Sequence, residues 1–193
     1  MSDIEGKGFT LDRLLSYSGI ITGIHTEPIE LTEPFLDTAE RFAHLPGTVL
    51  LASGGDLDCA KHHILAVNPW LSFSGRDNDY AVSVQGHEVK TGSDPLKMLR
   101  ELLNGFKISP SEINPVGTDI PVAAGLFGYF SYDLKDLLEE LPRPSVDDLQ
   151  LPQIYLFAPS IIVTHKLETG ETLLSVVDRK TEEGFSTRNH DLF

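Results

Sequence analysis

The sequence predicts an α+β fold with a mainly antiparallel β-sheet and flanking helices. Short apolar or alternating segments follow one another without regularly spaced helices, which indicates a meander rather than βαβ units. Two of these segments flank Gln85-Gly86, a pair suited to a tight hairpin turn. At 193 residues and 40% hydrophobic content, the chain is long enough for a domain with a sizeable core.

Helices are indicated by capping residues followed by apolar side chains at helical spacing. Thr32 is a candidate cap for the first helix, and Ser93 or Asp94 is a candidate cap for the second, with Pro95 at its first position. An acidic third segment repeats leucine at helical spacing. Helices are therefore expected at residues 32–44, 93–105 and 133–141.

Strands are indicated by short apolar or alternating runs that end at glycine, proline or other turn residues. The run around Pro159 forms either one long strand or two strands broken at the proline. Strands are expected at residues 19–24, 48–53, 63–67, 70–75, 80–84, 87–90, within 121–132, at 154–167 and at 171–177.

The overall charge and composition exclude several classes of function. The chain has 29 acidic and 15 basic residues, a formal charge of -14, which repels a nucleic-acid backbone. No segment approaches the roughly 20 apolar residues of a membrane span, and no secretory leader is recognisable. Cys59 is the lone cysteine, which is typical of a reducing compartment. A cytoplasmic protein without nucleic-acid or membrane partners is expected.

The densest cluster of potential metal ligands lies in residues 54–63. Thiolate, imidazole and carboxylate groups are the usual zinc ligands. A structural zinc site normally needs a second ligand cluster, and the sequence contains none, so a polar loop between two strands is favoured over a metal site. The potential ligands are Asp56, Asp58, Cys59, His62 and His63.

The residues alone predict no self-contained catalytic site. Ser53 has neither the full G-x-S-x-G context of a nucleophile elbow nor an obvious base, and Cys59 lacks the surroundings of a catalytic thiol. The GLFGYF run, residues 125–130, has two glycines but neither the third glycine nor the lysine of a phosphate-binding loop.

Six segments, in order, resemble the N-terminal domain of the chorismate-aminating enzymes, the large subunits (component I) of aminodeoxychorismate synthase and anthranilate synthase. Together they extend from about Phe35 to Val177. The aminodeoxychorismate branch is favoured because Ala52 stands where anthranilate synthases usually carry an acidic residue. The segments are HLPGTVLLASGG (44–55), HILAVNPWLSFSG (63–75), TGSDPLKMLRELL (91–103), AAGLFGYFSYDLKDLLEELP (123–142), DDLQLPQIYLFAPSIIVTHK (147–166) and LLSVV (173–177).

The resemblance implies a division into an N-terminal segment (1–31), a component I N-terminal domain (32–178) and a polar tail (179–193). In this family, chorismate, Mg²⁺ and the catalytic groups belong to a C-terminal domain, and a glutamine amidotransferase subunit supplies ammonia. The resemblance therefore implies an inactive half-enzyme without catalytic residues, cofactor or metal of its own. An isolated domain, a stand-alone gene product and a truncation remain open.

The resemblance also implies a partial pocket for tryptophan. Ser53 corresponds to the family serine that contacts the amino acid, and a neighbouring loop closes over it. The expected ligand-binding residues are Ser53, Cys59, Ala60, Lys61 and His62. A stand-alone module that binds tryptophan or docks the amidotransferase is the alternative.

Two further expectations follow for the part of the chain that would adjoin the missing domain. An uncovered apolar interface favours self-association. Gly125 and Gly128 are expected in a central strand, where they allow neighbouring elements to come close while Phe127, Tyr129, Phe130 and Tyr132 fill the core.

Overall fold

The structure is a computed structural model that describes residues 20–55, 58–106, 113–114, 120–139 and 147–180. The described residues form one nine-stranded sheet, two α-helices and one 3-10 helix, with strand order β5-β4-β3-β8-β9-β1-β6. Two further strands are outside this order: β2 pairs with β3, and β7 pairs with β8. The elements are β1 (Ile20–Ile29), α2 (Phe35–Phe42), β2 (Val49–Leu51), β3 (His62–Arg76), β4 (Asp79–Val84), β5 (His87–Gly92), α3 (Pro95–Gly105), β6 (Ile113–Asn114), β7 (Phe127–Phe130), η2 (Tyr132–Leu137), β8 (Ile154–Lys166) and β9 (Thr172–Lys180).

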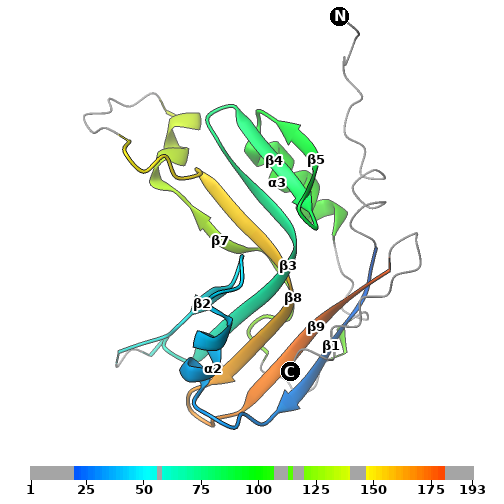
Figure 1. Cartoon of the computed structure of the whole chain (residues 1–193), viewed down its shortest axis with the longest axis vertical. Helices are drawn as coiled ribbons and strands as arrows, with labels where there is room; N and C mark the ends of the chain where they lie inside the picture. The colour runs from blue at the N-terminus through cyan, green and yellow to red at the C-terminus, as the bar shows by residue number, and fades with distance from the viewer. Residues whose placement is uncertain (1–19, 56–57, 107–112, 115–119, 140–146, 181–193) are drawn as a thin grey trace, which may run out of the picture.

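The long antiparallel strands β3 and β8 form a ribbon that organises the fold (Figure 1). The upper half of the ribbon pairs with β4 and β7, whereas the lower half pairs with β2 and β9. The single sheet therefore has two parts that share the ribbon, and we call these parts the upper sheet and the lower sheet. The antiparallel pairing, apart from the parallel pair of β1 and β6, confirms the predicted fold class.

The ribbon bends where two prolines face each other. Pro69 on β3 is the register partner of Pro159 on β8, and the register shifts between Pro69 and Leu71. Asn68, directly before this point, has a φ of 56°. Because proline has no N–H to donate, the ladder is interrupted here, and the strands change direction between the two sheets. This bend positions the apolar cavity described below.

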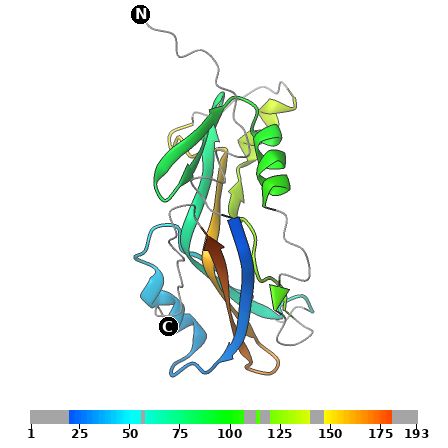
Figure 2. The same ribbon diagram turned by 90° about the vertical axis from the view of Figure 1, so that its right-hand side faces the viewer.

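Each sheet has its own core and its own helix. In the upper core, α3 contributes Met98 and Leu102 to a cluster with Phe73 and Tyr80. In the lower core, Phe35 and Ala39 of α2 pack against residues of β3, β8 and β9. Figure 2 shows the two helices beside opposite ends of the ribbon and on opposite sides of it.

The sequence predicted one helix start correctly and misplaced the other. Asp94 caps α3, because its carboxylate accepts a hydrogen bond from the backbone N–H of Lys97 at 2.9 Å. Thr32 does not cap α2, which begins at Phe35 after Pro34 and has no side-chain cap. Pro34 occupies the N-cap position, and its side chain has no acceptor for the N–H groups of the first turn.

The expected strands at 63–67 and 70–75 are a single strand, β3, because the bulge at Pro69 bends the strand without ending it. The segment 154–167 is likewise continuous through Pro159, as the one-strand alternative predicted. The Gln85-Gly86 turn is confirmed, since both residues have positive φ, 50° and 80°, and connect β4 to β5.

The expectation for the aromatic strand was partly wrong. β7 is a short strand that pairs with β8, and of its predicted core residues Phe127 is buried. Phe130 and Tyr132 are 52% and 82% exposed, and Tyr129 also lies at the surface. The acidic segment after it forms the 3-10 helix η2 rather than an α-helix within the described residues.

Candidate functional site

The serine and histidine of the predicted ligand loop lie together where β2 and β3 diverge. The Ser53 hydroxyl donates a hydrogen bond to the backbone carbonyl of His62 at 2.7 Å. The Ser53 backbone N–H donates to Nδ1 of His63 at 3.1 Å. Ser53 is therefore held rigidly, with its hydroxyl proton engaged within the protein and its oxygen lone pairs still able to accept.

Cys59, Ala60 and Lys61 belong to the same connection but contact a different part of the fold. The backbone carbonyl of Lys61 accepts from the N–H of Leu167 at 2.9 Å, which fixes the loop against the turn between β8 and β9. Ala60 and Lys61 line a shallow depression of about 340 Å³ that neither Ser53 nor His62 lines. Cys59 is exposed. The five predicted residues therefore lie along the same connection between β2 and β3, but their side chains do not line one common cavity.

His62 is the predicted residue with the most distinctive surroundings. It begins β3 opposite Lys166, and its Nε2 atom is buried with no hydrogen-bond partner among the described residues. A buried imidazole nitrogen without a partner is costly, so this atom is a candidate contact for a polar group of a ligand.

The metal-site alternative gains no support in the described part of the chain. There, no group of three or more His, Cys, Asp or Glu side chains is arranged to hold an ion. Asp56 lies outside the described residues. His63 accepts a hydrogen bond from Ser53 and stacks on Phe35, with ring centroids 5.6 Å apart, rather than facing Cys59.

Sequence reasoning missed an aromatic stack between α2 and the lower sheet. The rings of His63 and His165, register partners on β3 and β8, both stack on Phe35. Nδ1 of His165 lies 2.8 Å from the Thr172 hydroxyl. Burial, and secondarily the neighbouring His63, lowers the pKa of His165 below 6.5. The two histidines are far apart in sequence, so only the strand pairing could reveal the stack.

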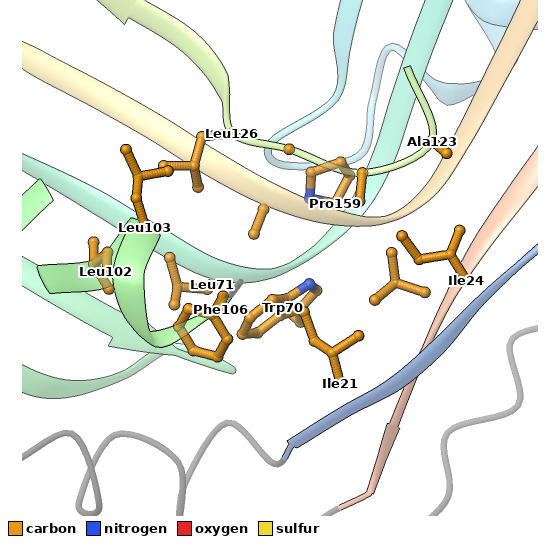
Figure 3. Close-up of a pocket in the computed structure, with 14 residues that line it drawn as sticks. Ile21, Ile24, Trp70, Leu71, Leu102, Leu103, Phe106, Ala123, Leu126 and Pro159 are labelled. Carbon is orange, nitrogen blue, oxygen red and sulfur yellow. The ribbon is translucent and has the colours of Figure 1, made fainter. Parts of the chain in front are cut away.

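Sequence reasoning also missed an apolar cavity of about 320 Å³ at the bend of the ribbon. Trp70 and Leu71 of β3 and Pro159 of β8 form its base, and α3 contributes Leu102 and Leu103. Figure 3 shows these side chains converging from separate elements. The sequence shows the Pro69-Trp70 pair beside the cavity. It does not show the cavity itself, which forms by packing of distant segments across the bend.

An aromatic surface lies on β7 and the adjoining half of β8. The Tyr155 ring contacts Phe157 edge-on at a centroid distance of 4.5 Å, and Tyr129 lies 6.0 Å from Tyr155. These three rings form what we call the β7 face, whereas Phe130, the next residue of β7, pairs with the buried Ile154 and lies on the opposite side of the sheet. Exposed apolar groups of this kind often mark contact surfaces. Separately, no helix of the described residues is long and apolar enough to span a membrane.

Comparison with known proteins gives a consistent group of relatives, although no family model matches the chain. It is 30% identical over 136 residues to aminodeoxychorismate synthase component 1 of Escherichia coli, covering 69% of this chain and 29% of that protein. It is 33% identical over 136 residues to anthranilate synthase component 1 of Mycolicibacterium smegmatis, covering 69% of this chain and 25% of that protein.

Comparison with solved structures also finds a protein named anthranilate synthase component I. The crystal structure of anthranilate synthase component I from Streptococcus pneumoniae aligns with a TM-score of 0.44 and 21% identity, over 79% of this chain and 30% of that one. The chain spans less than a third of the length of each of these three proteins.

Proposed function

Because this chain belongs with component I of aminodeoxychorismate synthase and anthranilate synthase, whose homologous segments cover about 70% of it, we propose that it is the non-catalytic N-terminal domain of a component I. The specific assignment is to aminodeoxychorismate synthase. The complete enzyme would convert chorismate and glutamine-derived ammonia to 4-amino-4-deoxychorismate, on the route to p-aminobenzoate and folate. The chain alone would be inactive.

The observation that carries this proposal is the long, continuous match to a protein more than three times the length of the matched part. A segment of 136 residues at 30% identity extends over most of the folded chain and 29% of the Escherichia coli enzyme. The remaining length is sufficient for a separate catalytic domain. Mg²⁺ and chorismate would bind in that domain.

The choice of branch depends on the residue before Ser53. Ala52 is an exposed alanine directly after β2, where the resemblance places an acidic residue in anthranilate synthases. The identities to the two kinds of relative are too similar, 30% and 33%, to favour either one. Anthranilate synthase component I, with tryptophan as a feedback ligand, is therefore the second candidate.

A tryptophan site would be built around Ser53 and His62. The Ser53 oxygen would accept from the amino group of the ligand, and the buried Nε2 of His62 would contact its carboxylate or amino group. Cys59, Ala60 and Lys61 would form the outer loop, and the catalytic domain would complete the apolar wall. Calorimetry with tryptophan tests this: heat that is lost in Ser53→Ala supports the site, and absence of heat at millimolar ligand contradicts binding by the chain alone.

The β7 face would contact the chorismate-binding domain, and the assembled component I would bind a glutamine amidotransferase subunit. In the absence of the chorismate-binding domain, the exposed β7 face would promote self-association at high concentration. Light scattering over a concentration series tests this, with Tyr129→Ser as the variant and Leu36→Ser, an exposed leucine on α2, as the matched control. A monomer at every concentration contradicts the proposed interface.

The experiment that tests the function is a pair of chimeras. This chain would replace its homologous segment in Escherichia coli aminodeoxychorismate synthase component 1 and, separately, in Mycolicibacterium smegmatis anthranilate synthase component 1. Growth without added p-aminobenzoate in the first chimera, and no growth without added tryptophan in the second, supports the proposed branch. The reverse result assigns the anthranilate branch. Failure of both soluble chimeras contradicts the proposed role.

A further inference from the structure

The cavity at the bend of the ribbon lies among side chains that are themselves buried. Trp70 and Leu71 of β3 and Leu102 of α3 line it, as do Ile24 of β1 and Val177 of β9. Each of these residues is 5% exposed or less. The cavity is therefore enclosed by the fold on several sides, in contrast to the open β7 face.

The size of the cavity suits a small organic molecule. Its volume is about 320 Å³, near the lower end of the roughly 300–1,000 Å³ that is typical of ligand pockets. An engineered apolar cavity of about 150 Å³ is already large enough to bind benzene. The cavity at the bend can therefore hold one substituted aromatic ring or two fused rings.

The lining of the cavity favours an uncharged ligand. Among the described residues, no charged side chain lines it, and the indole N–H of Trp70 is its one polar side-chain group. A charged ligand would lose its hydration there without a compensating partner, which is costly. The lining residues are Ile21, Ile24, Trp70, Leu71, Leu102, Leu103, Phe106, Ala123, Ala124, Gly125, Leu126, Ala158, Pro159 and Val177.

Trp70 gives the cavity an aromatic wall that is fixed in place. The Phe106 ring meets the Trp70 ring nearly perpendicularly, with centroids 5.1 Å apart and an interplanar angle of 74°. The guanidinium carbon of Arg179, which does not itself line the cavity, lies 4.7 Å from the centroid of the Trp70 ring. Figure 3 shows Trp70 between Phe106 and Ile21. A rigid indole held in this way stacks on a planar ring more favourably than burial alone provides.

We propose that this cavity binds a small, uncharged aromatic molecule, with its ring packed against Trp70. The site is separate from the tryptophan site proposed around Ser53 and His62, because none of the five residues of that site lines the cavity. Free tryptophan carries an ammonium and a carboxylate group, so it does not suit this lining. The proposal does not depend on the assignment of the chain to either synthase.

Trp70 makes the test direct because it is the single tryptophan of the chain. Bromine quenches indole fluorescence on contact, so bromobenzene is the probe. Free N-acetyltryptophanamide, which undergoes collisional quenching alone, is the reference. We expect saturable quenching of Trp70 with a dissociation constant below about 1 mM, which a molecule of this size reaches well within the known limit of binding energy per atom.

Related compounds test the charge and the aromatic character of the ligand. The anion 4-bromobenzoate and the cation 4-bromobenzylamine share the brominated ring, and we expect both to bind at least about tenfold more weakly than bromobenzene, because the lining offers their charges no partner. Benzyl alcohol should displace bromobenzene more effectively than cyclohexanemethanol, through stacking on Trp70, although cyclohexanemethanol is the more hydrophobic competitor. Tryptophan should not displace the probe.

A variant with a matched control locates the site. Ala124→Leu fills part of the cavity and should weaken the binding of bromobenzene at least about tenfold, whereas Ala52→Leu, at an exposed position, should leave it unchanged. Because a ligand that binds the native state stabilises it, bromobenzene should also raise the Tm of the unaltered chain and of Ala52→Leu, and should raise that of Ala124→Leu less. Circular dichroism confirms that each variant is folded before the affinities are compared.

Four results would overturn the proposal. Quenching that stays linear up to about 1 mM overturns the site. Equal affinity for the three brominated probes overturns the preference for an uncharged ligand, and displacement by cyclohexanemethanol that equals that by benzyl alcohol overturns the aromatic class. Full affinity in folded Ala124→Leu overturns the location. Should Ala124→Leu not fold, the order of the three probes in the unaltered chain still decides the outcome.

Discussion

Gly128→Ala should destabilise the protein strongly, because the backbone of β8 occupies the space of the new methyl group. Gly128 has a φ of +143°, and a Cβ at this residue would lie 2.0 Å from the carbonyl oxygen of Tyr155 and 3.0 Å from its carbon. Those atoms belong to the central ribbon and are held by pairing on both sides of β8. The backbone of β8 therefore cannot move away without disturbing the ladder.

The size of the effect follows from the two ways in which the chain can respond. Keeping the present backbone requires a conformation that costs an L-residue about 1–3 kcal/mol, in addition to the clash. Moving β7 away instead exposes Phe127, which is 7% exposed now, at a cost that approaches the roughly 3–5 kcal/mol of losing a buried phenylalanine. A loss of about 3 kcal/mol or more in the free energy of unfolding is expected.

Gly125→Ala is the matched control. Gly125 has no strained φ, and the nearest atom to a new Cβ, Cε2 of Phe127, is 4.0 Å away. The substitution should change stability by less than about 1 kcal/mol, the size of the entropic effect on the unfolded chain. Urea unfolding followed by far-UV circular dichroism measures both variants. Equal shifts of the midpoint in the two variants would refute the reasoning.

Three other changes test other contacts. Asp94→Ala should lower the free energy of unfolding by about 1 kcal/mol, because it removes the cap of α3, while Asp94→Ser should retain most of it; urea unfolding measures both. Tyr80→Phe should cost about 1 kcal/mol, because the buried hydroxyl donates to Oε1 of Gln153; no change in the urea midpoint would contradict this. The pKa of His165 is lowered in the folded protein, so this imidazole binds a proton more readily in the unfolded chain than in the folded one. Stability should therefore fall as pH drops below about 6.5, and should fall less steeply in His165→Gln; the same dependence of stability on pH in both proteins would contradict a role for the buried His165.

Local signals allowed much of the fold to be predicted. Asp94 before Pro95, and Gln85-Gly86 between alternating segments, mark a helix start and a hairpin through short-range backbone chemistry. The antiparallel class followed from the succession of such segments. These features depend on neighbours in sequence, so a single chain contains the information for them.

The misjudged features depend on contacts between distant parts of the chain. The aromatic segment is typical of a core strand, but β7 pairs with β8 alone among the described strands, and Phe130, its last residue, is 52% exposed. Whether Pro69 ends or bends a strand depends on Pro159, its partner across the ribbon. The same holds for the cavity wall, where Arg179 reaches Trp70 through strand pairing that no local pattern records.

The most direct test of the central claim is reconstitution of activity from two chains. This protein would be mixed with the Escherichia coli aminodeoxychorismate synthase component 1 lacking its homologous segment, in the presence of chorismate, ammonium and Mg²⁺. We predict that neither chain alone forms 4-amino-4-deoxychorismate and that the mixture does, with less product when Gly128→Ala replaces the unaltered chain. Product formation by this chain alone, or no product from a demonstrated complex of the two chains, would contradict the account.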